Sequence, residues 1–345
     1  MSLTLRPFGE ADAECWDAFV RAFPEGTFFH LAGWRQVIAE AFGHREHYTI
    51  AERSGQIVGV MPLFHLKSHL FANGLISVPF CVYGGPLALD EETRKALDDH
   101  AVALMGQVGA DFVEFRSRVP SRADWVCRDD LYFDFRKPIA EDADAILKSI
   151  PRKQRAVVRK VIDAGEVSDA VEDNIDNFYR AYAEGVRDHG TPIFGKRYFQ
   201  KIVDVFGDAV EIRTVKDADG RVLNSVMSFY YGDEIHLYYA GGAPDAKRRG
   251  TVHYLYWRAM CGAREKGYSV CNFGRSKAGS GGYDMKSHWK CDVAPLTYEF
   301  RLKEGKTLPD FNPLNPKYRL QIAIWRRLPL PVANLVGPFV ARNLG

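Results

Sequence analysis

The hydrophobic positions of the first half predict alternating helices and strands. Apolar residues recur at helical spacing at Leu31, Trp34, Val37, Ile38 and Ala41. Strand-like apolar runs follow at 48–52, 56–66 and 75–85. A helix is predicted from about Glu92 to Val108, and it leads past Gly109 into a strand over 111–118.

The second half repeats this order. One apolar helical face is formed by Tyr198, Phe199, Ile202, Val203 and Phe206. Strands are predicted at 210–216, 221–232 and 234–242, the first two joined by an Asp219-Gly220 hairpin turn. A further apolar helical face carries Val252, Leu255, Tyr256, Ala259, Met260 and Ala263. This helix stops at Gly267, and a strand follows over 269–276.

Landmark residues also recur in the two halves. Each half has an aromatic segment with a glycine pair before its helix, at 83–85 and 239–242. Each has an Arg-Ser pair after the following strand, at 116–117 and 275–276, roughly 30 residues on, the scale of one β-α-β unit. Any α/β protein alternates in this way, but the shared hairpin and terminal motifs favour an internal duplication.

The predicted fold class is therefore α/β (α+β), with two tandem domains, each a mixed, mostly antiparallel sheet flanked by helices. We place the domains at 1–137 and 138–310, followed by an amphipathic tail at 311–345.

Composition narrows the class of protein. The chain has 345 residues, of which 46% are hydrophobic and 26% charged, a globular balance that excludes general disorder. A net charge of only +2 means that any basic function is local. We find no signal peptide and no apolar run long enough to span a bilayer, so we expect a cytoplasmic protein. Six scattered cysteines without a C-x-x-C pair predict reduced thiols and no metal site.

The segment 271–291, "CNFGRSKAGSGGYDMKSHWKC", is rich in glycine and cations but matches neither common phosphate-binding motif. Gly274 and Gly279 have the spacing of a nucleotide P-loop, yet Ser280 stands where that motif needs lysine. Gly279 and Gly281 start a dinucleotide fingerprint, but Asp284 replaces its third glycine. We expect instead a loop that folds over an anionic substrate or cofactor.

The strand, glycine pair and helix order resembles the core of the GNAT acyltransferases, so each half is expected to be GNAT-like. In that family a helix N-terminus receives the cofactor pyrophosphate. The family signature Arg/Gln-x-x-Gly-x-Gly/Ala is similar to Lys247, Arg248, Arg249, Gly250, Thr251 and Val252. The resemblance implies cofactor binding at Lys247, Arg248, Arg249, Gly250 and Thr251. Val252 is larger than the signature residue, which keeps open the alternative of a non-catalytic GNAT-fold binding protein of an export or exopolysaccharide system.

The tandem arrangement resembles the FemAB-like acyltransferases, most closely those associated with exosortase/PEP-CTERM systems and exopolysaccharide production. The resemblance is carried by Phe273, Gly274, Arg275, Ser276, Lys277, Gly279, Gly281, Tyr283, Lys286 and Trp289. It implies transfer of an acyl or aminoacyl group to an amine on a sugar or cell-envelope precursor. The donor is left open between acyl-CoA and aminoacyl-tRNA. The Fem-type alternative is a tRNA-dependent peptidyltransferase, although no heptad-repeat arm is present.

Three residues are candidates for the chemistry. Lys286 corresponds by resemblance to a lysine that meets a phosphate or developing negative charge. Tyr239, at a strand end, is a candidate proton donor or positioning residue, although either Tyr238 or Tyr239 could be a plain strand aromatic. Asp284 is the candidate base or amine anchor, and a solvated aspartate is equally compatible with its position.

Substrate contacts are predicted at several further positions. Beside the glycine-rich segment and in the corresponding place of the first half these are Arg275, Ser276, Lys277, Tyr283 and Tyr83. His189 and Thr191 lie on a connection that is expected to line the acceptor pocket. Arg152, Arg155 and Arg159 form a basic helical stripe for a nucleotide sugar, the CoA 3′-phosphate, a tRNA end or anionic lipid. A solvated helix face is the alternative.

The tail joins Trp325, Arg326 and Arg327 to a short apolar, proline-containing stretch. It is too short to span a bilayer, so we expect contact with the inner face of the cytoplasmic membrane or packing between the two halves. Expected partners are a small-molecule or lipid-linked sugar substrate, a tRNA, and the membrane. Because the tandem could complete the fold internally, a monomer is plausible.

Overall fold

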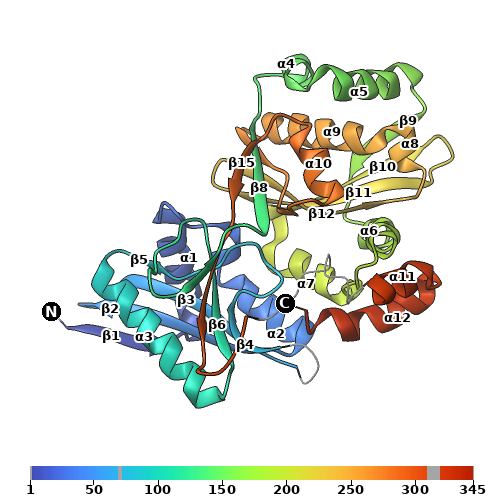
Figure 1. Cartoon of the computed structure of the whole chain (residues 1–345). Helices are drawn as coiled ribbons and strands as arrows, with labels where there is room; N and C mark the ends of the chain where they lie inside the picture. The colour runs from blue at the N-terminus through green and yellow to red at the C-terminus, as the bar shows by residue number, and fades with distance from the viewer. Residues whose placement is uncertain (1, 69–71, 309–318, 345) are drawn as a thin grey trace. The chain divides into compact units, whose positions relative to one another are not determined.

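The computed structural model describes residues 2–68, 72–308 and 319–344 (Figure 1). The chain forms two compact units. Unit 1 consists of residues 1–131, 295–312 and 339–345, and unit 2 of residues 132–294 and 313–338. Within the predicted tail, residues 311–318 and 345 lie outside the described residues.

Unit 1 is built on a mostly antiparallel sheet in the order β1-β2-β3-β4-β6-β16-β7, with β5 beside β3. Only the β4–β6 pair is parallel among the strand pairs described. The strands are β1 (Leu3–Pro7), β2 (Arg45–Arg53), β3 (Gln56–Lys67), β4 (Asn73–Ser77), β5 (Leu87–Ala88), β6 (Phe112–Ser117), β7 (Val126–Arg128) and β16 (Thr297–Leu302).

Helices pack against β2 and β3 of this sheet, whose central residues are buried in unbroken runs. The helices of unit 1 are η1 (Glu10–Asp12), α1 (Ala13–Ala22), η2 (Phe28–His30), α2 (Gly33–Phe42) and α3 (Glu91–Val108). The α3 helix is the one predicted from residue 92. Its N-cap is Asp90, whose carboxylate accepts from the Thr93 amide, and it ends at Gly109 in the left-handed conformation.

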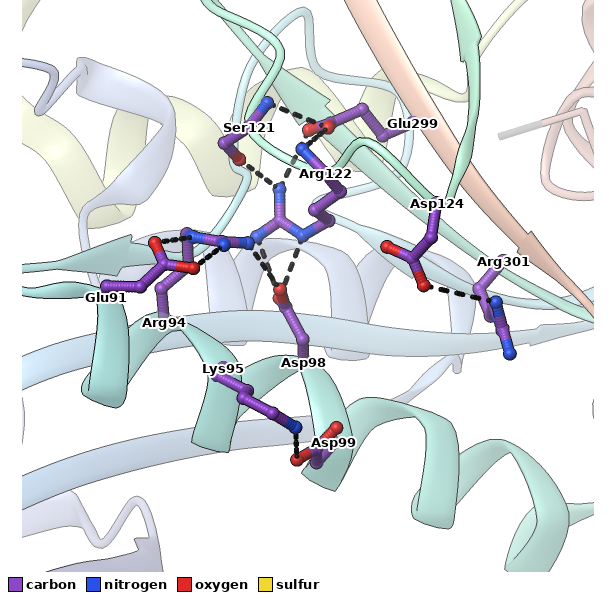
Figure 2. Close-up of polar contacts among 10 residues, drawn as sticks. All are labelled: Glu91, Arg94, Lys95, Asp98, Asp99, Ser121, Arg122, Asp124, Glu299 and Arg301. Atoms are coloured by element: carbon purple, nitrogen blue, oxygen red, sulfur yellow. Dashed lines mark hydrogen bonds and ion pairs between the residues drawn. The ribbon is translucent and has the colours of Figure 1, made fainter.

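One strand of the unit 1 sheet, β16, comes from late in the chain. β16 pairs with both β6 and β7, and Glu299 on β16 is fully buried. Figure 2 shows its carboxylate accepting from the amides of Ser121 and Arg122 and from the Arg122 guanidinium, at 2.9, 2.8 and 2.8 Å. Arg122 also donates to Asp98 of α3 at 2.8 Å. This charged network fixes β16 and the 121–122 turn against α3.

Unit 2 has a second mostly antiparallel sheet, in the order β14-β8-β13-β12-β11-β10-β9, with β15 beside β8. Among the described strand pairs of unit 2, the β12–β13 pair is parallel and the others are antiparallel. The strands are β8 (Tyr132–Pro138), β9 (Val167–Val171), β10 (Val210–Asp217), β11 (Val222–Tyr231), β12 (Glu234–Gly242), β13 (Val270–Asn272), β14 (Ser276–Lys277) and β15 (Asp292–Pro295).

Figure 1 shows α5 and α9 on one face of this sheet and α6 on the other. The helices are α4 (Ala143–Ser149), α5 (Arg152–Ala164), α6 (Ile175–His189), α7 (Lys196–Phe206), η3 (Gly207–Ala209), α8 (Ala246–Arg249), α9 (Thr251–Glu265), α10 (Gly281–Ser287), α11 (Arg319–Arg327) and α12 (Leu330–Ala341). Both units therefore confirm the predicted α/β class with mixed, mostly antiparallel sheets flanked by helices.

Two local features differ from the sequence-based expectations. The predicted domain borders at 137/138 and 310/311 divide the chain elsewhere than its contacts do, because β8 pairs within the second sheet and β16 within the first. The glycine-rich segment is not wholly a loop. Gly281–Ser287 forms α10, whose N-cap Ser280 accepts from the Tyr283 amide, because serine at this position satisfies a free helical N–H.

Candidate functional site

The central feature of unit 2 is a fork between its two parallel strands. β12 and β13 pair only through Glu234–His236 and Val270–Asn272, after which β12 continues to Gly242 paired with β11. The β11–β12 register shifts between Met227 and Ser228, which leaves Tyr238 as the extra residue of a bulge. The β12–β13 pairing ends after His236 and Asn272, and the bulge follows directly on β12, so the two strands are no longer paired beyond this point.

A row of buried polar side chains crosses the strands at this fork. The Asn272 amide nitrogen donates to Asp134 and to Glu234, both at 3.0 Å, and its amide oxygen accepts from the Gly274 amide. Arg136 forms an ion pair with Glu234, and the His236 ring lies 3.9 Å from the same carboxylate. Alternate residues of β8 and β12 thus form one polar face.

Asp134, Glu234, His236 and Asn272 are not among the residues predicted from the sequence. The available signal was polar residues at alternate positions in otherwise apolar strands, as in "EIHLYY" and "YFDF". Alternation of this kind also marks an ordinary solvent-facing strand. Only the pairing of three separate strands shows that these residues are buried together.

Lys286 reaches the end of β13 from α10. Its ammonium donates to the carbonyls of Gly274 and Arg275 at 2.8 and 3.0 Å, and the residue is 9% exposed. Burial lowers the pKa of Lys286 to about 8, and the nearby Asp134 carboxylate opposes part of that shift. The strand end therefore carries a positive charge that can be lost in a mildly alkaline range.

The other predicted residues of the glycine-rich segment lie beside β8 or on α10. The guanidinium of Arg275 and the ammonium of Lys277 lie over the Tyr132 ring, 4.7 and 5.6 Å from its centroid, and Ser276 pairs with Phe133 in β14–β8. Tyr283 packs edge-on against Phe133 and Phe135. Asp284 is exposed on α10.

Tyr239 lies on β12 in an aromatic cluster with α6 and α7. Its hydroxyl is 2.8 Å from the Tyr198 hydroxyl, and its ring meets Tyr182 and Phe199 edge-on. The neighbouring bulge residue Tyr238 is partly exposed and contacts the His236 ring. Of the two strand tyrosines, Tyr239 is thus the buried one.

The glycines that close β12 allow α6 to approach it closely. A Cβ on Gly241 would lie 2.3 Å from the Ala181 carbonyl and 2.5 Å from the Tyr182 Cα. Backbone atoms cannot move aside as a flexible side chain can, so glycine is required here for helix–strand packing.

The predicted cofactor motif spans α8 and the start of α9. Lys247 and Arg248 are exposed, whereas Arg249 pairs with Asp217. Gly250 has φ +78°, and a Cβ there would lie 2.4 Å from Val157 of α5. Thr251 is fully buried, and its hydroxyl donates to the Ala246 carbonyl.

Three further predicted groups lie elsewhere in the two units. On α5, Arg152 and Arg159 are exposed and Arg155 donates to the Lys148 carbonyl. His189 and Thr191 are exposed at the end of α6, where the His189 ring donates to the Gly185 carbonyl. The remaining residue, Tyr83, is buried in unit 1 under the Arg118 guanidinium.

Among the described residues, no group of three or more His, Cys, Asp or Glu side chains is placed to hold a metal ion. The described helices include none with the length and apolar character needed to cross a membrane.

Comparison with known proteins gives one match to a family model, over part of the chain. Residues 149–290 match the family model described as the acetyltransferase (GNAT) domain. Comparison with curated proteins gives no significant match.

Several solved structures share the fold over nearly the whole chain. The crystal structure of FemX matches with a TM-score of 0.65 and 15% identity, over 92% of this chain and 99% of that one. A tandem GNAT protein from the clavulanic acid biosynthesis pathway matches with a TM-score of 0.56 and 10% identity, over 89% and 100%. The C-terminal domain of a putative lysylphosphatidylglycerol synthetase from Agrobacterium fabrum matches with a TM-score of 0.52 and 15% identity, over 85% and 92%.

These likenesses confirm the expected tandem of GNAT-like folds. The residues that match the GNAT acetyltransferase model, 149–290, include most of unit 2, and the strand fork with its polar row lies in the same unit.

Proposed function

We propose that unit 2 transfers an acyl or aminoacyl group to an amine at the fork of β12 and β13. The observation that carries this proposal is the short β12–β13 pairing with buried titratable side chains at the point of divergence. Acyl transfer needs a group that accepts the amine proton and a positive or N–H environment for the oxyanion. The fork offers both kinds of group.

His236 and Glu234 are the residues we assign to proton removal. A neutral imidazole accepts a proton readily near neutral pH, and the Glu234 carboxylate 3.9 Å away would stabilise the imidazolium that forms. Lys286 contributes positive charge at the end of β13. Asp284, exposed on α10, stays a candidate for anchoring the acceptor amine.

The packing of α5 against Gly250 restricts how acyl-CoA, the usual donor of this fold family, can approach this glycine. The space beside the Gly250 Cα is occupied by Val157, and the Thr251 hydroxyl is already bonded. The exposed cations Lys247 and Arg248 can still meet phosphate. We therefore assign no step to CoA and leave the donor to experiment.

The test is a transfer assay with the full chain, using acetyl-CoA, longer acyl-CoAs and aminoacyl-tRNA as donors and amino sugars among the acceptor amines. Product formation is followed by mass spectrometry. We expect His236→Ala to lower the rate of transfer by on the order of 10²-fold, because the amine keeps its proton. The exposed His288 on the same unit serves as the control, since His288→Ala should retain the wild-type rate. Absence of transfer from every donor would favour the non-catalytic binding protein.

An aminoacyl-tRNA donor is the second candidate, and the surface of α5 and α8 favours it. The exposed cations there are Arg152, Lys153, Arg159, Lys160, Lys247 and Arg248. The two helices are neighbours, because Val157 of α5 lies against Gly250 at the end of α8. No acid occurs between residues 152 and 162, so the local charge is strongly positive in a chain of net charge +2.

Filter binding with aminoacyl-tRNA should detect this surface. We expect affinity to fall steeply with salt, and Lys153→Glu with Lys160→Glu to weaken binding by roughly 10-fold or more at low salt. The exposed Arg197 of α7 is the matched control, and Arg197→Glu should change little. Binding that is insensitive to salt or to the α5 substitutions would remove the tRNA candidate.

The acceptor that we propose is an amine on a sugar or on another cell-envelope precursor. The resemblance to FemAB-like proteins of exosortase/PEP-CTERM systems suggests an amine on a sugar, an exopolysaccharide intermediate or another cell-envelope precursor. Amino sugars in the acceptor panel test this directly, because acylation of a simple peptide amine alone would contradict it.

A further inference from the structure

The helices α11 and α12 expose an unusual amount of apolar surface. Twelve large apolar side chains are strongly exposed in the described part of the chain, and six of them lie on these two helices. They are Leu320, Ile324, Val332, Leu335, Val336 and Phe339, with Leu320, Leu335 and Phe339 exposed by 71, 70 and 66%. We call these six residues the apolar face. Large exposed apolar groups concentrated in this way mark an interaction surface.

The burial pattern of α12 is inverted relative to an ordinary surface helix. Its buried positions are small and spaced by four residues, at Ala333, Gly337 and Ala341. Its large apolar residues at 332, 335, 336 and 339 have helical spacing and point to the exposed side. A helix selected only to pack on its own domain would bury the large residues and expose polar ones.

The inward face cannot exchange with the outward one. A Cβ on Gly337 would lie 2.9 Å from the backbone nitrogen and oxygen of Ile193, and one on Gly190 would lie 2.5 Å from Ile322 of α11. Because these approaches need glycine, rotating α12 to bury Leu335 would place a bulky side chain against backbone. The apolar face is therefore a fixed feature of the fold.

The charges around the apolar face select its occupant. Residues 319–344 contain no acid, and Arg326, Arg327 and Arg342 are exposed. Arginines around an apolar helical face complement a surface with anionic headgroups and an apolar interior. At 12 residues, α12 is about 18 Å long, which suits a helix lying in the interface plane.

We propose that α11 and α12 bind an anionic membrane surface, with the apolar face inserted at the level of the headgroups and acyl chains. This inference is independent of the proposed transfer reaction. It places the exposed end of α6, including His189 and Thr191, next to the lipid, because Arg326 of α11 donates to the His189 carbonyl.

Vesicle sedimentation of the full chain tests the proposal. The vesicles are phosphatidylcholine alone and phosphatidylcholine mixed with phosphatidylglycerol. We expect binding to the anionic vesicles and its loss with salt. Leu335→Ser with Phe339→Ser should weaken the partition coefficient by more than tenfold, and Arg326→Gln with Arg327→Gln by roughly tenfold. Leu89→Ser, at an exposed leucine of unit 1, is the control and should bind as wild type.

Further measurements distinguish membrane binding from unfolding of the variants and from self-association through the apolar face. Circular dichroism confirms that each variant is folded, which is expected because the substituted side chains are exposed. Equal sedimentation of wild type and the Leu335→Ser, Phe339→Ser variant would overturn the proposal. So would a concentration-dependent dimer, seen by analytical ultracentrifugation, that these substitutions abolish in a protein that binds no vesicle.

Discussion

Replacing Arg122 with methionine is expected to lower the free energy of unfolding of unit 1 by about 3–5 kcal/mol. The Arg122 side chain is 2% exposed and that of Glu299 is fully buried, so the substitution leaves a carboxylate without its counter-charge. Asp98 loses its buried partner as well, because the same guanidinium bonds to it (Figure 2). Methionine retains the apolar stem that packs beneath the guanidinium, so the loss reports mainly the charge.

Urea unfolding followed by circular dichroism and tryptophan fluorescence measures this effect. The control is Arg301→Met, which breaks the exposed pair with Asp124 at 3.4 Å and should cost less than about 1 kcal/mol. Adding Glu299→Gln to Arg122→Met should recover part of the loss, since it removes the buried charge. Equal destabilisation by Arg122→Met and Arg301→Met would show that the network contributes no more than a surface pair.

The Arg122→Met variant should also respond to pH in a defined direction. Burial already raises the pKa of Asp98, and loss of the guanidinium would raise it further. A carboxyl group whose folded pKa is raised contributes stability when protonated and loses that contribution as pH rises through the folded pKa. The difference in unfolding free energy between wild type and variant should therefore narrow as pH falls through the folded pKa of Asp98.

Replacing Lys286 with methionine is expected to lower the rate of transfer by on the order of 10²-fold, as loss of one preorganised charge at an active site typically does. Lys286→Arg retains a charge whose pKa stays above the assay range. Because the pKa of Lys286 is lowered to about 8, wild-type kcat/KM should decline above that pH, whereas the arginine variant should hold its activity to higher pH. A decline at the same pH in both proteins would assign it to another group.

The lowered pKa of Lys286 also predicts that its charge affects the free energy of unfolding in a pH-dependent way, whereas its hydrogen bonds affect it at every pH. The folded pKa of about 8 lies below the ordinary lysine value of 10.5, so the unfolded chain binds more protons between these values. Wild-type stability relative to Lys286→Met should therefore rise from about pH 8 to about pH 10.5. Loss of the bonds to Gly274 and Arg275 lowers stability at every pH, and that part does not titrate.

The elements with strong local signals could be predicted from the sequence. The apolar faces of α3, α7 and α9 follow the period of 3.6 residues, and Gly109 and Gly267 mark the ends of helical segments as expected. The Asp219-Gly220 hairpin joins β10 to β11 because Gly220 takes φ +77°, which the turn requires. These features depend on residues close together in the chain.

The site depended on contacts between distant segments and was predicted only in part. Lys286 can be selected from the sequence, but its partners Gly274 and Arg275 and its neighbour Asp134 require the packing of α10 on β8 and β14. The Glu234, His236 and Asn272 row required the parallel pairing of β12 with β13, and strand pairing of this kind leaves no local pattern. Gly250 is predicted from the sequence to bind a cofactor, and only the structure shows that it also accommodates Val157 of α5.

The sequence by itself determined the class of the fold, its tandem repeat and most helices, because apolar periodicity and turn residues act over a few positions. It also determined the family likeness through the glycine-rich segment. The tertiary structure decided that β16 completes the first sheet, that four polar residues meet at the fork, and that α12 turns its large apolar side chains outward. Each of these depends on which distant segment packs against which, and the free energy of such packing is shared between residues that no local window contains.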